Sequence, residues 1–180
     1  VVLGQNPGYQ LVLKNDAVTS TTTYEFDMYI VSFGQTSFEL ATIQPIMTFN
    51  TAISGGTITL SLVGSTSDLN SGQVPTGFTV SGNELRIAAK TPPGAGSGTV
   101  IVESPGIRVG RFRVTSSVNF VTTEKANVAW KNASNPYTKV NAYVAAANTE
   151  ITDVTCNSHI NTLDNTFLPV KLVSFTGSAN

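Results

Sequence analysis

The chain has 180 residues, which is enough for one domain with a hydrophobic core of its own. Hydrophobic residues make up 41% of it, charged residues only 12%, and the formal net charge is −1, so bulk electrostatics does not draw it to nucleic acid. Cys156 is the single cysteine, which excludes an intrachain disulfide and a thiolate metal cluster, and no apolar run reaches the roughly 18 residues of a membrane helix.

Apolar and polar residues alternate with a period of two along most of the chain, which predicts β-strands. The first clear case is segment 24–30, and segments 58–62, 85–87 and 140–144 alternate in the same way. Turns rich in glycine, proline and asparagine separate these runs, and helical signals are weak. We therefore predict an all-β fold, a jelly-roll β-sandwich of about nine strands.

The domain boundaries follow from where the alternation begins and ends. Residues 1–8 are expected to be an extended lead-in, residues 9–175 a single β-sandwich domain, and residues 176–180 the start of a linker.

One predicted strand changes phase in its middle. The apolar residues of segment 107–109 lie on one face, whereas those of segment 112–114 are one step out of phase, with Gly110 at the slip. A β-bulge at Gly110 and Arg111, with glycine at positive φ, would restore a single buried face. Arg108 and Arg113 would then point outward.

Three stretches carry a resemblance to a known family. Segment 24–30 with segment 38–40, and segment 106–114, resemble strands of cohesin-like modules in secreted proteins of Bacteroidota. Segment 44–53 resembles the motif in which a strand of these modules runs into an aromatic residue, an Asx turn and a buried aliphatic residue. The resemblance spans residues 9–175 and implies a nine-stranded jelly roll, a fold shared with several carbohydrate-binding modules.

The end of the chain carries a second resemblance. Residues 168–177 read LPVKLVSFTG, and they resemble the segment that closes modules of Bacteroidota multidomain proteins before a type IX secretion sorting region. This implies an extracellular or cell-surface location and neighbouring domains in a longer chain. It does not specify a ligand, because a shared fold is not a shared function.

Catalytic constellations find little support in the sequence. Glu25 and Asp27 are two residues apart on one strand face, about 7 Å, as paired hydrolytic acids could be, but a solvated outer face is the favoured interpretation. Cys156 and His159 could touch on a short turn, but a lone histidine in a loop-like context is more often a surface residue. We therefore predict no catalytic residue and no enzyme.

No cofactor and no metal-ligating set is predicted either. Calcium stays open, because Asp153, Asp164 and backbone carbonyls could supply the converging oxygens that this ion needs, although no spacing argues for it.

Candidate ligand-binding residues are aromatic or cationic. Tyr137 lies in a predicted loop and could stack on a sugar ring, whereas Trp130 alternates with a valine, which favours a core position. Arg108 and Arg113 could pair with the carboxylates of an acidic partner or polysaccharide, but solubility of an exposed sheet is the simpler interpretation. Two further aromatic candidates are Tyr29 and Tyr143.

Three functions follow. The favoured one is a non-catalytic extracellular module that serves adhesion or extracellular assembly, with a protein or polysaccharide at the cell surface as partner. The second is a carbohydrate-binding module attached to a polysaccharide-degrading enzyme. The third is a subunit of an extracellular filament, in which the apolar segment 9–13 pairs with a neighbour's sheet edge, although pairing within its own sheet is favoured.

Overall fold

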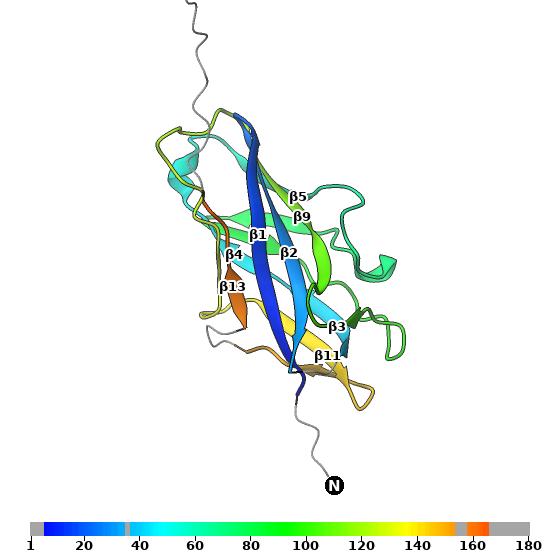
Figure 1. Cartoon of the computed structure of the whole chain (residues 1–180). Helices are drawn as coiled ribbons and strands as arrows, with labels where there is room; N and C mark the ends of the chain where they lie inside the picture. The colour runs from blue at the N-terminus through cyan, green and yellow to red at the C-terminus, as the bar shows by residue number, and fades with distance from the viewer. Residues whose placement is uncertain (1–5, 35–36, 154–157, 166–180) are drawn as a thin grey trace, which may run out of the picture.

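The computed structural model describes residues 6–34, 37–153 and 158–165 (Figure 1). The chain is nearly all β, as predicted, and the helical segments among the described residues are two short 3-10 turns, η1 (Thr51–Ile53) and η2 (Ser71–Gln73). The abundance of threonine, serine and asparagine favours strands and turns over helix. In the part of the chain that the structure describes, no helix is long and apolar enough to cross a membrane.

A five-stranded sheet forms one layer. Its order is β13 (His159–Asn161), β1 (Gly8–Ser20), β2 (Thr23–Phe33), β9 (Ile107–Ser116) and β5 (Ile58–Leu62). β1 and β2 form a long antiparallel hairpin, and β13 joins the other edge of β1 in parallel. Figure 1 shows β1, β2 and β9 running side by side.

The other layer contains two four-stranded sheets. One has the order β12 (Ala147–Glu150), β11 (Lys139–Val144), β3 (Phe38–Gln44) and β8 (Val100–Ile101). The second has the order β10 (Ala129–Trp130), β4 (Ile46–Thr48), β7 (Glu84–Ile87) and β6 (Phe78–Ser81). In Figure 1, β3, β4 and β11 lie behind β1 and β2.

Pro45 separates these two sheets. It follows β3 and precedes β4, and because proline has no N–H it interrupts the strand ladder there. The Thr138 hydroxyl accepts from the N–H of Ile46 (3.1 Å) and donates to its carbonyl (2.9 Å), which also accepts from the backbone N–H of Lys131 (2.9 Å). Interruptions of this kind explain why the described residues form thirteen strands, several of two or three residues, rather than about nine.

One hydrophobic core lies between the layers and makes the arrangement sandwich-like. The alternation predicted for segment 24–30 is confirmed, since its apolar side chains are fully buried. The two layers meet through residues such as Phe26, Met28, Phe112, Leu40, Met47, Leu85 and Val140.

The ends of the predicted domain are described only in part. β1 begins at Gly8, one residue before the predicted start, while residues 1–5 lie outside the described residues. Residues 166–180, which include segment 168–177 and the predicted linker, also lie outside them. Segment 9–13 pairs with β2 along one side and, over residues 11–13, with β13 along the other, so it pairs within its own sheet.

The predicted bulge in β9 is present, one residue earlier than expected. Met28 pairs with Gly110 and Tyr29 with Arg108, so Val109 is the extra residue. The bulge turns Val109 inward along with the apolar side chains of segment 112–114, and it leaves the arginines on the outer face.

The reason for a glycine at position 110 differs from the prediction. Gly110 is not among the residues with positive φ. A Cβ at this position would instead lie 2.3 Å from Cδ1 of Leu62 on the neighbouring strand. A side chain here would therefore have to displace the end of the half-buried Leu62 side chain, so the glycine accommodates a close side-chain approach and not a special backbone conformation.

Candidate functional site

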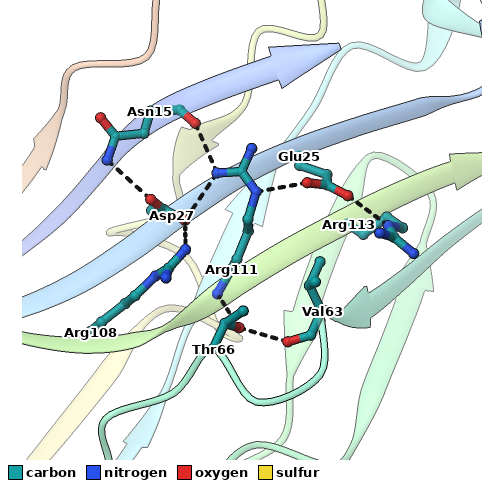
Figure 2. A network of polar contacts seen from close by, with 8 residues as sticks. All are labelled: Asn15, Glu25, Asp27, Val63, Thr66, Arg108, Arg111 and Arg113. Carbon is teal, nitrogen blue, oxygen red and sulfur yellow. Dashed lines mark hydrogen bonds and ion pairs between the residues drawn. The ribbon is translucent and has the colours of Figure 1, made fainter. Parts of the chain in front are cut away.

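The outer face of the five-stranded sheet carries a charged cluster, which we define as Glu25, Asp27, Arg108, Arg111 and Arg113 (Figure 2). Strand alternation places the two acids on the face opposite the core. The antiparallel register of β2 and β9 then sets Glu25 across from Arg113 and Asp27 across from Arg111, so that opposite charges are cross-strand neighbours.

Arg111 lies at the centre of the charged cluster. Its Nε donates to Glu25 Oε2 (2.7 Å), and its Nη1 donates to Asp27 Oδ1 (3.1 Å). Nη1 also donates to the backbone carbonyl of Asn15 on β1 (3.1 Å). One guanidinium therefore ties β9 to β2 and to β1, as Figure 2 shows.

The remaining carboxylate oxygens are also occupied. Glu25 Oε1 accepts from Nε of Arg113 (2.8 Å), and Asp27 Oδ1 accepts from Nη2 of Arg108 (2.5 Å). Asp27 Oδ2 accepts from Nδ2 of Asn15 (3.0 Å). Both oxygens of both acids thus have a donor, and most of these bonds are charge-assisted.

The two acids are not solvated, which corrects the expectation of an exposed outer face. Glu25 is 6% exposed and Asp27 5%, because the guanidinium groups lie over them. Burial alone would raise their pKa values. Hydrogen bonds from Arg111 and Arg113 to Glu25, and from Asn15, Arg108 and Arg111 to Asp27, outweigh burial and hold both pKa values below the ordinary range.

A loop braces the strand that carries the arginines. The Thr66 hydroxyl accepts from the backbone N–H of Arg111 (3.0 Å) and donates to the carbonyl of Val63 (2.6 Å), as Figure 2 shows. The N–H of Asp68 donates to the carbonyl of Arg108 (2.9 Å). The loop therefore continues the pairing of β5 along the edge of β9.

The structure brings Arg108 and Arg113 together in the charged cluster and places the two aromatic candidates elsewhere. Trp130 is partly buried against the core, and its Nε1 donates to the carbonyl of Ile160 (2.9 Å). Tyr137 is half-buried, with Nζ of Lys139 5.2 Å from its ring centroid.

Among the other aromatic candidates, Tyr29 lies on the outer face of the five-stranded sheet, with Nζ of Lys14 3.7 Å from its ring centroid. Tyr143 accepts at its hydroxyl from the N–H of Gly94 (2.7 Å).

His159 is buried, so the expectation of a surface histidine is wrong. Its ring lies 5.5 Å from the ring of Trp130 and 5.9 Å from that of Tyr9. Nδ1 faces the side-chain oxygen of Asn132, and Nε2 lies 3.1 Å from the Tyr9 hydroxyl, which accepts from the N–H of Asp153 (3.0 Å). Burial lowers the pKa of His159 to about 4, so the ring is neutral at neutral pH.

Little in the sequence indicates this buried histidine, because its partner Tyr9 is 150 residues away and β13 has only three residues. Alternation cannot be recognised in so short a strand. Cys156, which the sequence analysis considered as a catalytic partner of His159, lies outside the described residues.

Asp153 and Asp164, the residues considered as calcium ligands, form hydrogen bonds to different parts of the protein. Asp153 accepts from the Ser158 hydroxyl (2.7 Å), and the backbone N–H of Asp164 donates to Asp16 (2.9 Å). Within residues 6–34, 37–153 and 158–165, no three side chains of His, Cys, Asp or Glu gather as they would to hold a metal ion.

Comparison of the chain with protein-family models, with curated proteins and with solved structures found no match. The resemblance to cohesin-like modules stays a prediction from the residues that carry it.

Proposed function

We propose that the chain is a non-catalytic extracellular module that serves adhesion or extracellular assembly. The observation that carries this proposal is the state of Glu25 and Asp27. Hydrolysis by paired carboxylic acids requires that one of them keep a proton at the working pH. Here each acid is bound by two arginines and its pKa is lowered, so both serve as ionised partners that stabilise the sheet.

A nine-stranded, cohesin-like jelly roll is part of the proposal, and strand pairing supports it. β4 pairs with β7 and β10, and β3 pairs with β8 and β11. Without the short edge strand β12, the broken strands of the second layer occupy four positions, namely β6, β7 with β8, β4 with β3, and β10 with β11. Together with the five-stranded sheet these four give nine positions, and β12 adds a tenth at the edge.

The Asx turn of segment 44–53 supports the same assignment. The side-chain oxygen of Asn50 accepts from the N–H of Ala52 (3.0 Å), between the buried side chains of Phe49 and Ile53. This is the order that the resemblance implies. The extracellular location rests on segment 168–177 and its likeness to the end of type IX-secreted modules.

The proposal is tested with the chain in its source cells and in purified form. Immunolabelling of intact cells should detect it at the surface, and incubation with a polysaccharide panel should release no reducing ends. Labelling only after cell lysis would overturn the extracellular assignment, and release of reducing ends would overturn the non-catalytic one.

A carbohydrate-binding module of a polysaccharide-degrading enzyme is the second candidate, favoured by the half-buried ring of Tyr137 beside Lys139. The aromatic ring can stack on one sugar, and the neighbouring lysine can donate hydrogen bonds to the hydroxyls of the next sugar. In a glycan array, Tyr137→Ala should then abolish binding to a neutral glycan, while Phe33→Ala, at an exposed aromatic residue at the end of β2, should not. Equal loss in both variants, or no bound glycan, excludes this candidate.

A further inference from the structure

The outer face of the five-stranded sheet presents cations above its anions. The side chains of Glu25 and Asp27 are only 8% and 7% exposed. The arginines that cover them keep more of their surface, with side-chain exposures of 24% for Arg108, 19% for Arg111 and 45% for Arg113. A partner approaching this face therefore meets guanidinium groups first, although the chain as a whole has a net charge of −1.

Arg113 is the arginine best placed to bind a second anion. Its Nε is committed to Glu25, which fixes the plane of the guanidinium group. Its two terminal nitrogens make no hydrogen bond to any of the residues that the structure describes. A guanidinium edge held in this way can take a carboxylate through two parallel hydrogen bonds without first losing much side-chain entropy.

Exposed hydroxyl groups lie beside Arg113. Ser61 on β5 is its cross-strand neighbour, and Thr59 pairs with Thr115 two residues further along. Ser61 and Thr59 are exposed. The Thr59 hydroxyl donates to the carbonyl of Thr115 (3.4 Å) and can accept a further hydrogen bond. The face therefore offers the guanidinium group of Arg113 next to neutral hydroxyls, which is the combination that a sugar unit with both a carboxylate and hydroxyls would engage.

We propose that this face binds a carboxylated polysaccharide built from uronic acid units, with Arg113 as the main contact and the hydroxyls of Ser61 and Thr59 beside it. This inference rests on the proposed function and deepens it by naming the class of ligand and the surface. An acidic protein would match the charge, but the row of hydroxyls favours the sugar polymer. Arg108 and Arg111 bind the buried acids of the charged cluster, which keeps the face ordered, and they add to its positive potential.

The test is binding of the purified chain to immobilised polygalacturonate, with dextran as neutral polymer. Arg113→Gln removes the free fork and leaves Glu25 with Arg111 as partner. Its dissociation constant should rise by about 3- to 10-fold, the range for one exposed charge-assisted contact. Binding of the wild type should weaken as NaCl is raised from about 0.05 M to 0.5 M, because salt screens exposed charges.

Arg86→Gln is the matched control. Arg86 lies on β7 in the other layer, pairs with Glu84 and has a side chain 38% exposed, so the substitution removes the same charge from a similar ion pair. It should leave binding within about twofold of wild type. Equal weakening by both variants would show that only net charge matters and would overturn the proposal.

The remaining outcomes are also decisive. No binding to polygalacturonate, or equal binding to dextran, overturns the proposal. If polyglutamate binds as tightly as polygalacturonate, and Arg113→Gln weakens both equally, the face is assigned to acidic proteins instead. If surface labelling of intact cells succeeds while polygalacturonate does not bind, this inference fails alone. If polygalacturonate binds but the chain is found only inside cells, the proposed function fails.

Discussion

At the scale of single residues, burial decides which side chains can respond to their surroundings. Because Nδ1 of His159 faces the side-chain oxygen of Asn132, Nδ1 carries the proton, and Nε2 accepts from the Tyr9 hydroxyl. A second proton, on Nε2, would break the hydrogen bond that this nitrogen accepts from the Tyr9 hydroxyl. Gly110 shows the same dependence on surroundings, since only its neighbour Leu62 explains why it lacks a side chain.

The first prediction concerns pH. The pKa of His159 is about 4 in the folded chain and 6.5 in its ordinary state, so the unfolded chain binds the proton first as pH falls. The stability that depends on the neutral ring is fully present above pH 6.5 and is lost as pH falls towards 4, by about 3 kcal/mol in total. Urea unfolding at pH 7.5, 6, 5 and 4.5 measures this.

His159→Gln is the control for this prediction. It should remove most of the change between pH 6.5 and 4.5 while keeping the steeper loss at lower pH, where Glu25 and Asp27, whose pKa values are lowered, take up protons. A wild-type free energy of unfolding that is constant between pH 7.5 and 4.5 contradicts the buried neutral histidine.

The second prediction concerns Gly110. Gly110→Ala should lower the free energy of unfolding by up to about 1 kcal/mol, because the added methyl group must displace the end of the half-buried Leu62 side chain. Leu62→Ala makes room for it, so the double variant should be more stable than the sum of the two single losses predicts, by at least about 0.5 kcal/mol. Strictly additive losses in urea unfolding would show that backbone conformation is the cause.

At the scale of elements, β9 is the strand on which the outer face depends. Its bulge sets the arginines outward, its edge is braced by Thr66, and Arg111 connects it to both strands of the β1–β2 hairpin. Exposed ion pairs add little to the free energy of unfolding. A buried carboxylate that loses its cationic partner lowers the free energy of unfolding much more, because an unpaired charge is left in the protein interior.

The third prediction compares two arginines of β9. Arg111→Gln should cost about 1–3 kcal/mol of unfolding free energy, because it removes a donor from both Glu25 and Asp27 while they are buried. Arg113→Gln should cost at most about 1 kcal/mol, because its side chain is 45% exposed and Glu25 keeps Arg111. Equal unfolding midpoints for the two variants in urea would contradict a central role of Arg111.

At the scale of the whole molecule, the first and last described strands meet. β1 lies inside the five-stranded sheet between β2 and β13, and its inward side chains Tyr9, Leu11 and Leu13 are buried in the core shared by the two layers. The strand at the start of the domain is therefore part of its centre, in agreement with the favoured expectation that segment 9–13 pairs within its own sheet.

The fourth prediction follows from this position. Deletion of residues 1–14 should abolish cooperative unfolding, because it removes three buried side chains and leaves β2 and β13 without their common neighbour. Val12→Thr, on the outward side of β1, should keep a cooperative transition. The two are compared by thermal unfolding followed by circular dichroism. A deletion variant with an unchanged transition would contradict the central place of β1.

The sequence by itself determined the longer strands and their inward faces. Period-two alternation is local, so it identified Phe26 and Met28 as core residues, and the phase slip around Gly110 as a bulge with the arginines outside. Tertiary structure alone decided what those outward residues do. Glu25 and Asp27 are buried because arginines from β9, more than 80 residues away, cover them, and His159 is buried because β13 pairs with β1. Such environments are created by strand pairing across the chain, which no local pattern encodes.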